Sequence, residues 1–262
     1  MYINFFSFSQ LITGSIYLMG QKIDEIVRSK TAKHAPYPTV CVGNFQAGGT
    51  GKTPATLWVA KQLKGLGYSP VIIIRGYRGS VSKSTIVDRQ DAYAYGDETV
   101  LHAQHFPTIV GKNRLESTHL AHTIPGDKKV LIMDDGLQHY QLLKDFSIVC
   151  QKNLRFEADA MLPIGRLRQI PHTNVHAILS QINEAGYQKV ESWKGIPEYT
   201  FARETVLRSG SKEPGLVVCG VANPDDCLYR IQKAGEFIGD EMKFRDHHRY
   251  SAADLARMEK AS

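Results

Sequence analysis

Residues that could bind phosphate lie close together near the N-terminus. The stretch VGNFQAGGTGKTP, residues 42–54, ends an apolar run, continues with glycines and reaches Lys52 and Thr53. Lys52 could contact the outer phosphates of a nucleotide, and the Thr53 hydroxyl could hold Mg²⁺. Backbone N–H groups ahead of the lysine could turn toward phosphate oxygens, and the residues concerned are Gly48, Gly49, Thr50 and Gly51. We therefore predict a nucleotide-binding loop.

One position departs from the usual pattern of such loops. The standard spacing has a glycine five residues before Gly51, and this chain has Gln46 there. Because the glycines nearest the lysine are kept, we expect the first bend of the loop to differ and its phosphate contacts to remain. The alternative is a glycine-rich turn with a chance Gly-Lys-Thr.

Two adjacent aspartates could hold a metal ion. Asp134 and Asp135 end the apolar run VLIMD and precede a glycine. Enzymes with a phosphate-binding loop place the carboxylate on the Mg²⁺ side at the end of a later strand. We predict that Asp134, Asp135 or both hold Mg²⁺ together with Thr53, one of them through a water molecule. The alternative is an ordinary Asp-Asp-Gly turn.

Cations follow several of the apolar runs, in the motifs RGYRG, GKNR and LPIGRLR. They are Arg75, Arg78, Lys112, Arg114, Arg166 and Arg168. Each alone is more often a solvated surface residue, but several gathered on one edge would bind a second anionic group besides ATP.

Two motifs supply candidates for proton transfer. Asp97 in YGDET precedes a helical stretch, so it could cap that helix or accept a proton from an attacking hydroxyl. His247 and His248 lie in FRDHHRY. Adjacent residues of a strand point to opposite faces, so we expect no metal site made of both histidines. One of them could pair with an acid across a cleft, and the residues alone leave open which.

Alternating strands and helices are needed to bring these residues together. Apolar runs without alternation predict buried strands of a parallel sheet at 39–43, 71–75, 108–111, 130–134, 146–150, 177–180 and 215–222. Helical stretches fall at 54–64, 98–105, 113–121 and 225–236. This rhythm predicts an α/β fold with a doubly wound, mostly parallel sheet of the P-loop NTPase type. Such sheets bind ligands beyond the carboxyl ends of their strands.

The first 30 residues predict an amphipathic helix. Apolar residues recur every three or four positions, at Phe5, Phe8, Ile12, Ile16, Met19, Ile23 and Ile26. Polar residues interrupt every apolar run, so the segment is too polar to span a bilayer. It also lacks the basic start and cleavage site of a signal peptide. A helix packed on its own domain and a helix lying on a membrane surface both fit.

We expect three parts along the chain: the helix over 1–30, a P-loop domain over 31–185, and a linker with a smaller second α/β lobe over 186–262. The boundary follows from the more polar stretch at 183–213. Ser251 and Asp254 predict a capping box that opens a helix, and no glycine or proline closes this helix before Ser262. A fragment and an unusually short second lobe both fit that ending.

The composition of the chain indicates which classes of partner it could bind. The 262 residues are 42% apolar and carry a net charge of +6. This mild positive charge suggests an acidic ligand or an anionic membrane. No long Lys/Arg run and no nucleic-acid-binding signature occurs, so we expect no nucleic acid partner. Four cysteines without a CxxC spacing predict free buried thiols.

Taken in order, these motifs resemble the tetraacyldisaccharide 4'-kinase family of lipid A biosynthesis. The resemblance runs from the apolar N-terminal helix through VGNFQAGGTGKTP, RGYRG, GDE, DDGLQH, LPIGRLR and GVANP to FRDHHRY. It implies ATP-dependent phosphorylation, with Mg²⁺, of the 4'-hydroxyl of a tetraacylated glucosamine disaccharide 1-phosphate, an anionic glycolipid, to give lipid IVA. It also implies a peripheral enzyme on the cytoplasmic face of the bacterial inner membrane, which favours the membrane-surface interpretation of the first helix. We expect a monomer.

The resemblance further implies roles for single residues, and the family tolerates a residue other than glycine at Gln46. Lys52 and Thr53 match its phosphate and Mg²⁺ positions, and Asp134 and Asp135 match its metal-side acidic pair. Asp97 matches the acid of its catalytic dyad, and His247 rather than His248 matches the histidine. Gln138, Arg114 and Arg168 match polar positions that line its cleft. Together with Glu98, which lies beside Asp97, and with Arg75 and Arg78 of RGYRG, they are the predicted substrate-binding residues.

Two other functions stay open from the residues alone. Another P-loop small-molecule kinase, with a soluble substrate, would not need the apolar stripe of the first helix. A membrane-associated ATPase switch of the partition type would use a lysine that reaches across a dimer, and this chain has Ala47 at that position.

Overall fold

The chain is described by a computed structural model over residues 8–152, 161–169, 175–181, 195–202, 215–221, 223–235 and 238–261. It divides into two compact units, Met1–Ala202 and Arg203–Ser262. The expected domain boundary after residue 185 falls outside the described residues, so it stays a prediction.

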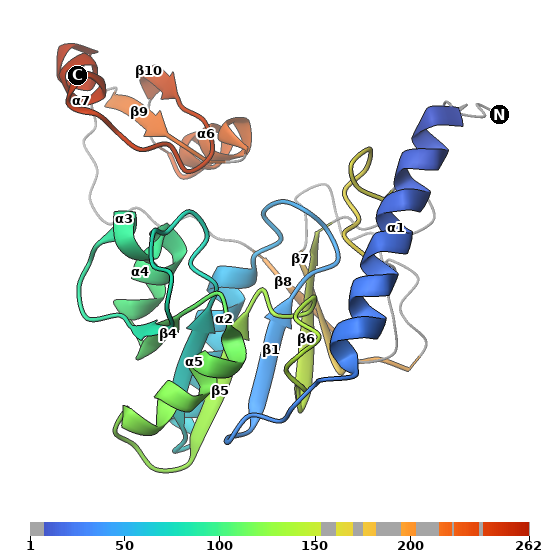
Figure 1. Ribbon diagram of the computed structural model, residues 1–262. Coiled ribbons are helices and arrows are strands. Elements are labelled where there is room, and N and C mark those ends of the chain that lie inside the picture. The colour runs from blue at the N-terminus through green and yellow to red at the C-terminus, as the bar shows by residue number, and fades with distance from the viewer. Residues whose placement is uncertain are drawn as a thin grey trace. The chain divides into compact units, whose positions relative to one another are not determined.

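The first unit is built on an eight-stranded sheet with the strand order β3-β4-β2-β5-β1-β6-β7-β8. All neighbouring strands run parallel except β3 and β4. Figure 1 draws the central strands β5, β1 and β6 near one another. The strands are β1 Thr39–Gly43, β2 Ser69–Ile74, β3 Thr85–Ile86, β4 Thr108–Val110, β5 Lys129–Asp134, β6 Phe146–Lys152, β7 Ala177–Gln181 and β8 Glu198–Phe201. The predicted doubly wound, mostly parallel sheet is confirmed.

Helices cover both faces of this sheet because successive side chains of a strand point to opposite faces. α2 (Lys52–Gly65) packs Val59 into one apolar cluster with Ile72 of β2. The next residue along the strand, Ile73, belongs to a cluster on the other face with Ala121. The remaining helices of this unit are α1 Phe8–Ser29, α3 Ala92–Tyr95, α4 Asp97–Ala103, α5 Arg114–Leu120 and the 3-10 helix η1 Ala121–Thr123.

From Ile16 onward, the apolar stripe of α1 lies on the exposed side of the helix. Gln21, on its packed side, donates a hydrogen bond to the Tyr140 hydroxyl at 3.1 Å. The large apolar side chains that are at least half exposed are Ile16, Met19, Ile23, Ile26 and Val27. None of the helices in the described part of the chain is long and apolar enough to cross a membrane.

The second unit holds a two-stranded parallel sheet of β9 (Gly215–Cys219) and β10 (Ile238–Lys243). α6 (Pro224–Lys233) connects these strands, and α7 (Ala252–Ala261) follows them. The strand predicted at 215–222 is therefore β9, outside the large sheet. The predicted capping box opens α7, because the Ser251 N–H donates to the Asp254 carboxylate at 2.9 Å and the Asp254 N–H donates to the Ser251 hydroxyl at 3.2 Å.

Candidate active site

The glycine-rich loop and the two aspartates lie at the same edge of the sheet. β1 and β5 are parallel neighbours, and their register pairs Val42 with Asp134. The Asp135 N–H donates to the Val42 carbonyl at 2.9 Å. Parallel strands end at one edge, so the structure brings together the loop that follows β1 and the aspartates that follow β5.

The loop leaves open space around Gly48 and Gly49. Gly48 and Gly51 have φ angles of 103° and 84°, a conformation that glycine adopts without steric cost. A Cβ added at Gly48 or Gly49 would meet nothing within 4 Å. α2 begins at Lys52, so the free N–H groups of its first turn and the positive end of its dipole lie at the loop. An anionic group can therefore approach the backbone here.

Two amide side chains fix the start of the loop. Asn44 donates to the Thr50 hydroxyl at 2.8 Å. Gln46 pairs with both backbone groups of Lys152, since its Nε2 donates to the carbonyl and its Oε1 accepts from the N–H, each at 3.1 Å. A glycine at position 46 could not make this pair. Gln46 therefore ties the loop to the end of β6, which gives the departure from the usual spacing a physical reason.

A second segment runs along the loop in the antiparallel direction. The Ala47 N–H donates to the Arg166 carbonyl at 2.6 Å, and the Arg168 N–H donates to the Phe45 carbonyl at 2.7 Å. This pairing brings the Arg168 side chain to the loop, although Arg168 is more than 100 residues away from the loop in the sequence.

Asp135 lies between two cations. Its carboxylate is 3.8 Å from Lys52 Nζ and accepts hydrogen bonds from Arg168 Nη1 at 3.0 Å and 3.1 Å. Burial acts to raise the pKa of Asp135, but Lys52 and Arg168 outweigh it and hold the pKa below its usual range. The φ angle of Asp135 is 52°, which residues other than glycine rarely adopt, so neighbouring contacts must hold this backbone.

Arg114 provides such contacts from beneath the aspartates. Its buried side chain donates from Nη2 to the carbonyl of Asp134 at 2.9 Å and to that of Asp135 at 3.0 Å. Burial lowers the pKa of the Arg114 guanidinium, and Asp135 acts against that effect. These contacts of Arg114 are with the protein backbone, and its expected contact with a substrate stays a prediction.

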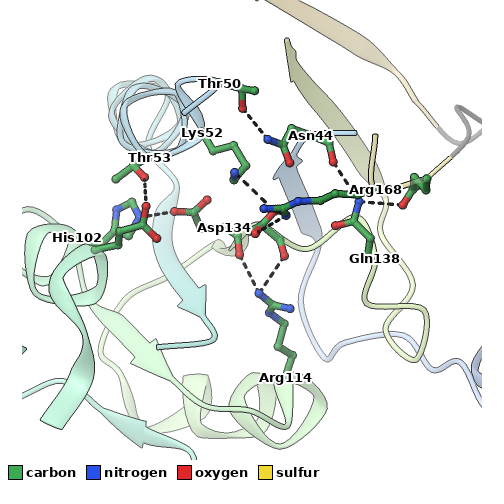
Figure 2. A network of polar contacts seen from close by, with 12 residues as sticks. Asn44, Thr50, Lys52, Thr53, His102, Arg114, Asp134, Gln138 and Arg168 are labelled. Carbon is green, nitrogen blue, oxygen red and sulfur yellow. Dashed lines mark hydrogen bonds and ion pairs between the residues drawn. The ribbon is translucent and has the colours of Figure 1, made fainter. Parts of the chain in front are cut away.

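Asp134 is held by a residue that sequence analysis missed. His102 in α4 places its Nε2 2.7 Å from Asp134 Oδ2, and both side chains are buried (Figure 2). Within the described residues, Asp134 Oδ1 has no hydrogen-bond partner. A lone histidine on a helix is usually a core or surface residue, and no spacing in the sequence links His102 to Asp134.

The start of α4 faces the start of α2. The Thr53 hydroxyl donates to Glu98 Oε1 at 3.1 Å. Asp97 is the first residue of α4 and is exposed, while Gly96 occupies the cap position. The interpretation of Asp97 as the helix cap is therefore wrong.

The other predicted substrate-binding residues differ in their surroundings. Gln138 donates to the Asn44 carbonyl at 3.0 Å and to Gln169 Oε1 at 2.8 Å, below the loop. Arg75 and Arg78 follow β2 and are exposed. The substrate contacts expected for these residues stay predictions.

His247 belongs to the second unit, whereas Asp97 belongs to the first. The Asp97–His247 dyad would join the two units, and it stays a prediction. Within its own unit, the His247 N–H donates to the Gly220 carbonyl at 3.0 Å. His248 pairs with Asp254 at 3.1 Å, so it is engaged by the capping box.

The residues at the sheet edge fit a nucleoside triphosphate with Mg²⁺. The cations and the open glycines suit phosphate oxygens, while the Thr53 hydroxyl and the unpartnered Asp134 Oδ1 are oxygen ligands that Mg²⁺ accepts. In the part of the chain that is described, no group of three or more His, Cys, Asp or Glu side chains could hold a metal ion. Mg²⁺ needs no such group where one or two carboxylates act together with substrate phosphates.

The fold and this site define a P-loop nucleotide-binding protein of the kinase type. A family model described as tetraacyldisaccharide-1-P 4'-kinase (LpxK) matches residues 6–262. The chain belongs to this family, as its motifs predicted.

Relatives and one solved structure agree with this assignment. The tetraacyldisaccharide 4'-kinase of Methylobacterium nodulans is 34% identical over 247 residues, which cover 86% of this chain and 70% of that protein. The enzyme of the same name from Haemophilus influenzae is 29% identical, over 87% of this chain and 71% of that protein. The crystal structure of LpxK from Aquifex aeolicus in complex with ATP is 25% identical, with a TM-score of 0.76, and covers 93% of this chain and 83% of that one.

Proposed function

We propose that this chain transfers the γ-phosphoryl group of ATP to the 4'-hydroxyl of a tetraacylated glucosamine disaccharide 1-phosphate. The observation that carries the proposal is the convergence of Lys52, Asp134 and Asp135 on an open glycine loop, in a chain of this family. In the transfer, the 4'-oxygen bonds to the γ-phosphorus, the bond from that phosphorus to the β,γ-bridging oxygen breaks, and ADP leaves.

The phosphates of ATP would lie along residues 48–53. In the structure Lys52 faces Asp135 at 3.8 Å, and incoming phosphates would compete with that carboxylate for the ammonium group. Lys52 and Arg168 then neutralise charge that develops on the transferred group, which is where most catalysis of phosphoryl transfer originates.

Asp97 is the proposed base. It is exposed at the first position of α4, so its carboxylate can accept the proton of the 4'-hydroxyl as the new bond forms. We assign His247 as the residue that orients Asp97, on the strength of the family motif that it shares. Glu98, Arg75, Arg78, Arg114, Gln138 and Arg168 are assigned to the substrate side of the site.

Thr53 and Asp134 or Asp135 would hold Mg²⁺. Mg²⁺ held there would reduce the charge repulsion between the phosphate oxygens and the incoming hydroxyl. Glu98 accepts a hydrogen bond from the Thr53 hydroxyl. This bond would orient the hydroxyl so that its oxygen can act as a ligand of Mg²⁺.

The exposed face of α1 supports a peripheral position on the membrane. Five large apolar side chains lie on that face, and a helix with such a face can bury it in the headgroup region of a bilayer. An acceptor with four acyl chains is itself held in a bilayer, so we place the protein, as a monomer, on the cytoplasmic face of the inner membrane.

The proposal is tested by incubating the chain with ATP labelled at the γ-phosphate, Mg²⁺ and the disaccharide 1-phosphate in mixed micelles. We expect label in a bis-phosphorylated glycolipid, and no label there with Lys52→Ala. Label only in inorganic phosphate, together with dimer formation on ATP binding, would favour an ATPase switch. Equal transfer to a deacylated, soluble disaccharide would favour a kinase for soluble substrates.

A further inference from the structure

His102 and Asp134 form a buried pair between α4 and the end of β5. The side chain of His102 is 0% exposed and that of Asp134 is 2% exposed, with 2.7 Å between Nε2 and Oδ2. His102 lies outside every motif of this sequence that carries the resemblance to the family. A buried carboxylate that is paired with an imidazole needs an explanation, because burying a charged group is costly unless it is hydrogen-bonded.

The unpartnered atoms of the pair indicate how it is arranged. A carboxylate oxygen accepts, so the imidazole donates from Nε2. His102 Nδ1 and Asp134 Oδ1 have no partner among the described residues. One carboxylate oxygen is thus fixed by the ring, and the other is left for a ligand from outside the chain.

α4 contacts the metal side of the site at two points on one face. Glu98 and His102 are four residues apart, so they lie on the same side of the helix. Glu98 accepts from Thr53 at 3.1 Å, and His102 pairs with Asp134. The same helix begins with Asp97. Two of the side chains that we assign to Mg²⁺, Thr53 and Asp134, are therefore held by the helix that carries the proposed base.

We propose that His102 is a positioning residue for Asp134. Its Nε2–H holds Oδ2, so that Oδ1 is the oxygen presented to Mg²⁺ or to a water bound to Mg²⁺. The inference rests on the proposed function only in taking Asp134 as a metal-side carboxylate. Residues that orient metal ligands in this way commonly change metal affinity about 10- to 100-fold when they are replaced.

The test measures metal binding without turnover. Mn²⁺ replaces Mg²⁺, and its affinity for the complex with a non-hydrolysable ATP analogue is measured by electron paramagnetic resonance. His102→Leu should weaken Mn²⁺ binding by about 10- to 100-fold. His102→Gln keeps an N–H donor and should recover most of that loss. His105→Gln, an exposed histidine one turn further on, should bind Mn²⁺ like the unmodified chain.

A double-mutant cycle separates positioning from general damage to the fold. If His102 acts through Asp134, then His102→Leu should have little further effect on Mn²⁺ affinity in an Asp134→Asn background. An equal loss in both backgrounds would overturn the inference, as would unchanged Mn²⁺ affinity in His102→Leu. Urea unfolding of each variant identifies any that are not folded. If His102→Leu is among them, His102→Asn, whose shorter side chain does not reach Asp134 Oδ2, takes its place and should show the same loss of Mn²⁺ affinity.

The outcome is independent of phosphoryl transfer. If the unmodified chain and the variants give the expected Mn²⁺ affinities but no glycolipid is phosphorylated, the proposed function fails and the positioning role stands. If transfer occurs and His102→Leu binds Mn²⁺ normally, the proposed function stands and the positioning role fails.

Discussion

Arg168 and Asp135 form an ion pair in which one guanidinium nitrogen lies 3.1 Å from Oδ1 and 3.0 Å from Oδ2. The pair exists because the segment around Arg168 runs antiparallel to the glycine loop. Asp135 also faces Lys52 at 3.8 Å, so the two cations share one carboxylate. Phosphates entering the loop would meet both cations already in position.

Replacing Arg168 should therefore weaken nucleotide binding. In Arg168→Ala, Lys52 has Asp135 to itself and one positive charge is missing, so we expect the dissociation constant for ATP to rise about tenfold, or roughly 1.4 kcal/mol. Arg168→Lys should recover only part of this, because an ammonium group lacks the planar fork of donors. Fluorescence titration with a labelled nucleotide measures the change. An unchanged ATP affinity in Arg168→Ala would show that Arg168 does not contribute to nucleotide binding.

Arg114 should be important for stability. Arg114→Met removes the donor to two buried carbonyls and frees the left-handed backbone of Asp135, so we expect the free energy of unfolding to fall by about 2–4 kcal/mol. Arg75→Ala is the control, at an exposed arginine that directly follows β2. It should lower the free energy of unfolding by about 0.5 kcal/mol or less. Urea denaturation measures both. If Arg114→Met unfolds like the unmodified chain and loses only affinity for the glycolipid, Arg114 is a substrate contact and its packing role is minor.

His139 should make stability depend on pH. Burial, with smaller contributions from Arg114 and Lys144, lowers the pKa of His139 from 6.5 to about 4. The unfolded chain then binds a proton between these pH values that the folded chain does not. Above pH 6.5, His139 is neutral in both states and does not reduce the free energy of unfolding. As the pH falls toward 4, protonation of His139 in the unfolded chain lowers that free energy by about 2–3 kcal/mol.

His139→Gln should remove this dependence. Urea denaturation at several values between pH 7 and pH 4.5 gives the slope of the unfolding free energy for each variant. The slope should flatten in His139→Gln and stay unchanged in His119→Gln, an exposed histidine on α5. Parallel curves for all three proteins would mean that His139 titrates normally in the folded state.

The central parts of this arrangement could be predicted from the sequence because they depend on local patterns. Unbroken apolar runs indicated the buried strands, and the residues that follow β1 and β5 identified the loop and the aspartates. The short edge strands β3, β8 and β10 carry too few apolar residues to stand out. The contacts of His102 and Arg114 depend on how α4 and α5 pack against the sheet, which no local spacing encodes.

Asp97 should control the chemical step more than binding. Asp97→Asn keeps the shape of the side chain but cannot accept the proton, so we expect kcat to fall by about 100- to 10,000-fold while ATP affinity changes little. His247→Gln should lower kcat as well, and the combined variant should be little worse than Asp97→Asn alone, since residues that act as a unit are not additive. Asp97→Asn with near-normal turnover would contradict the assignment of the base.

The exposed face of α1 should determine binding to membranes. Replacing Ile16, Met19 and Ile23 by serine removes large apolar side chains that are each more than half exposed, and burial of one such side chain contributes about 1.5–3 kcal/mol. We expect binding to vesicles containing anionic lipid to fall at least about tenfold in a sedimentation assay. Leu66→Ser, at an exposed leucine that directly follows α2, and Leu255→Ser, at an exposed leucine on α7, serve as controls. Equal vesicle binding by all variants would rule out α1 as the contact.

The identity and position of the new phosphate test the central claim most directly. The chain is incubated with ATP, Mg²⁺ and the disaccharide 1-phosphate lipid, and the glycolipid is examined by phosphorus NMR. We expect a second phosphomonoester on the 4'-oxygen, formed by the unmodified chain and not by Lys52→Ala over the same time. Recovery of the 1-phosphate alone, under conditions in which ATP is bound, would contradict it.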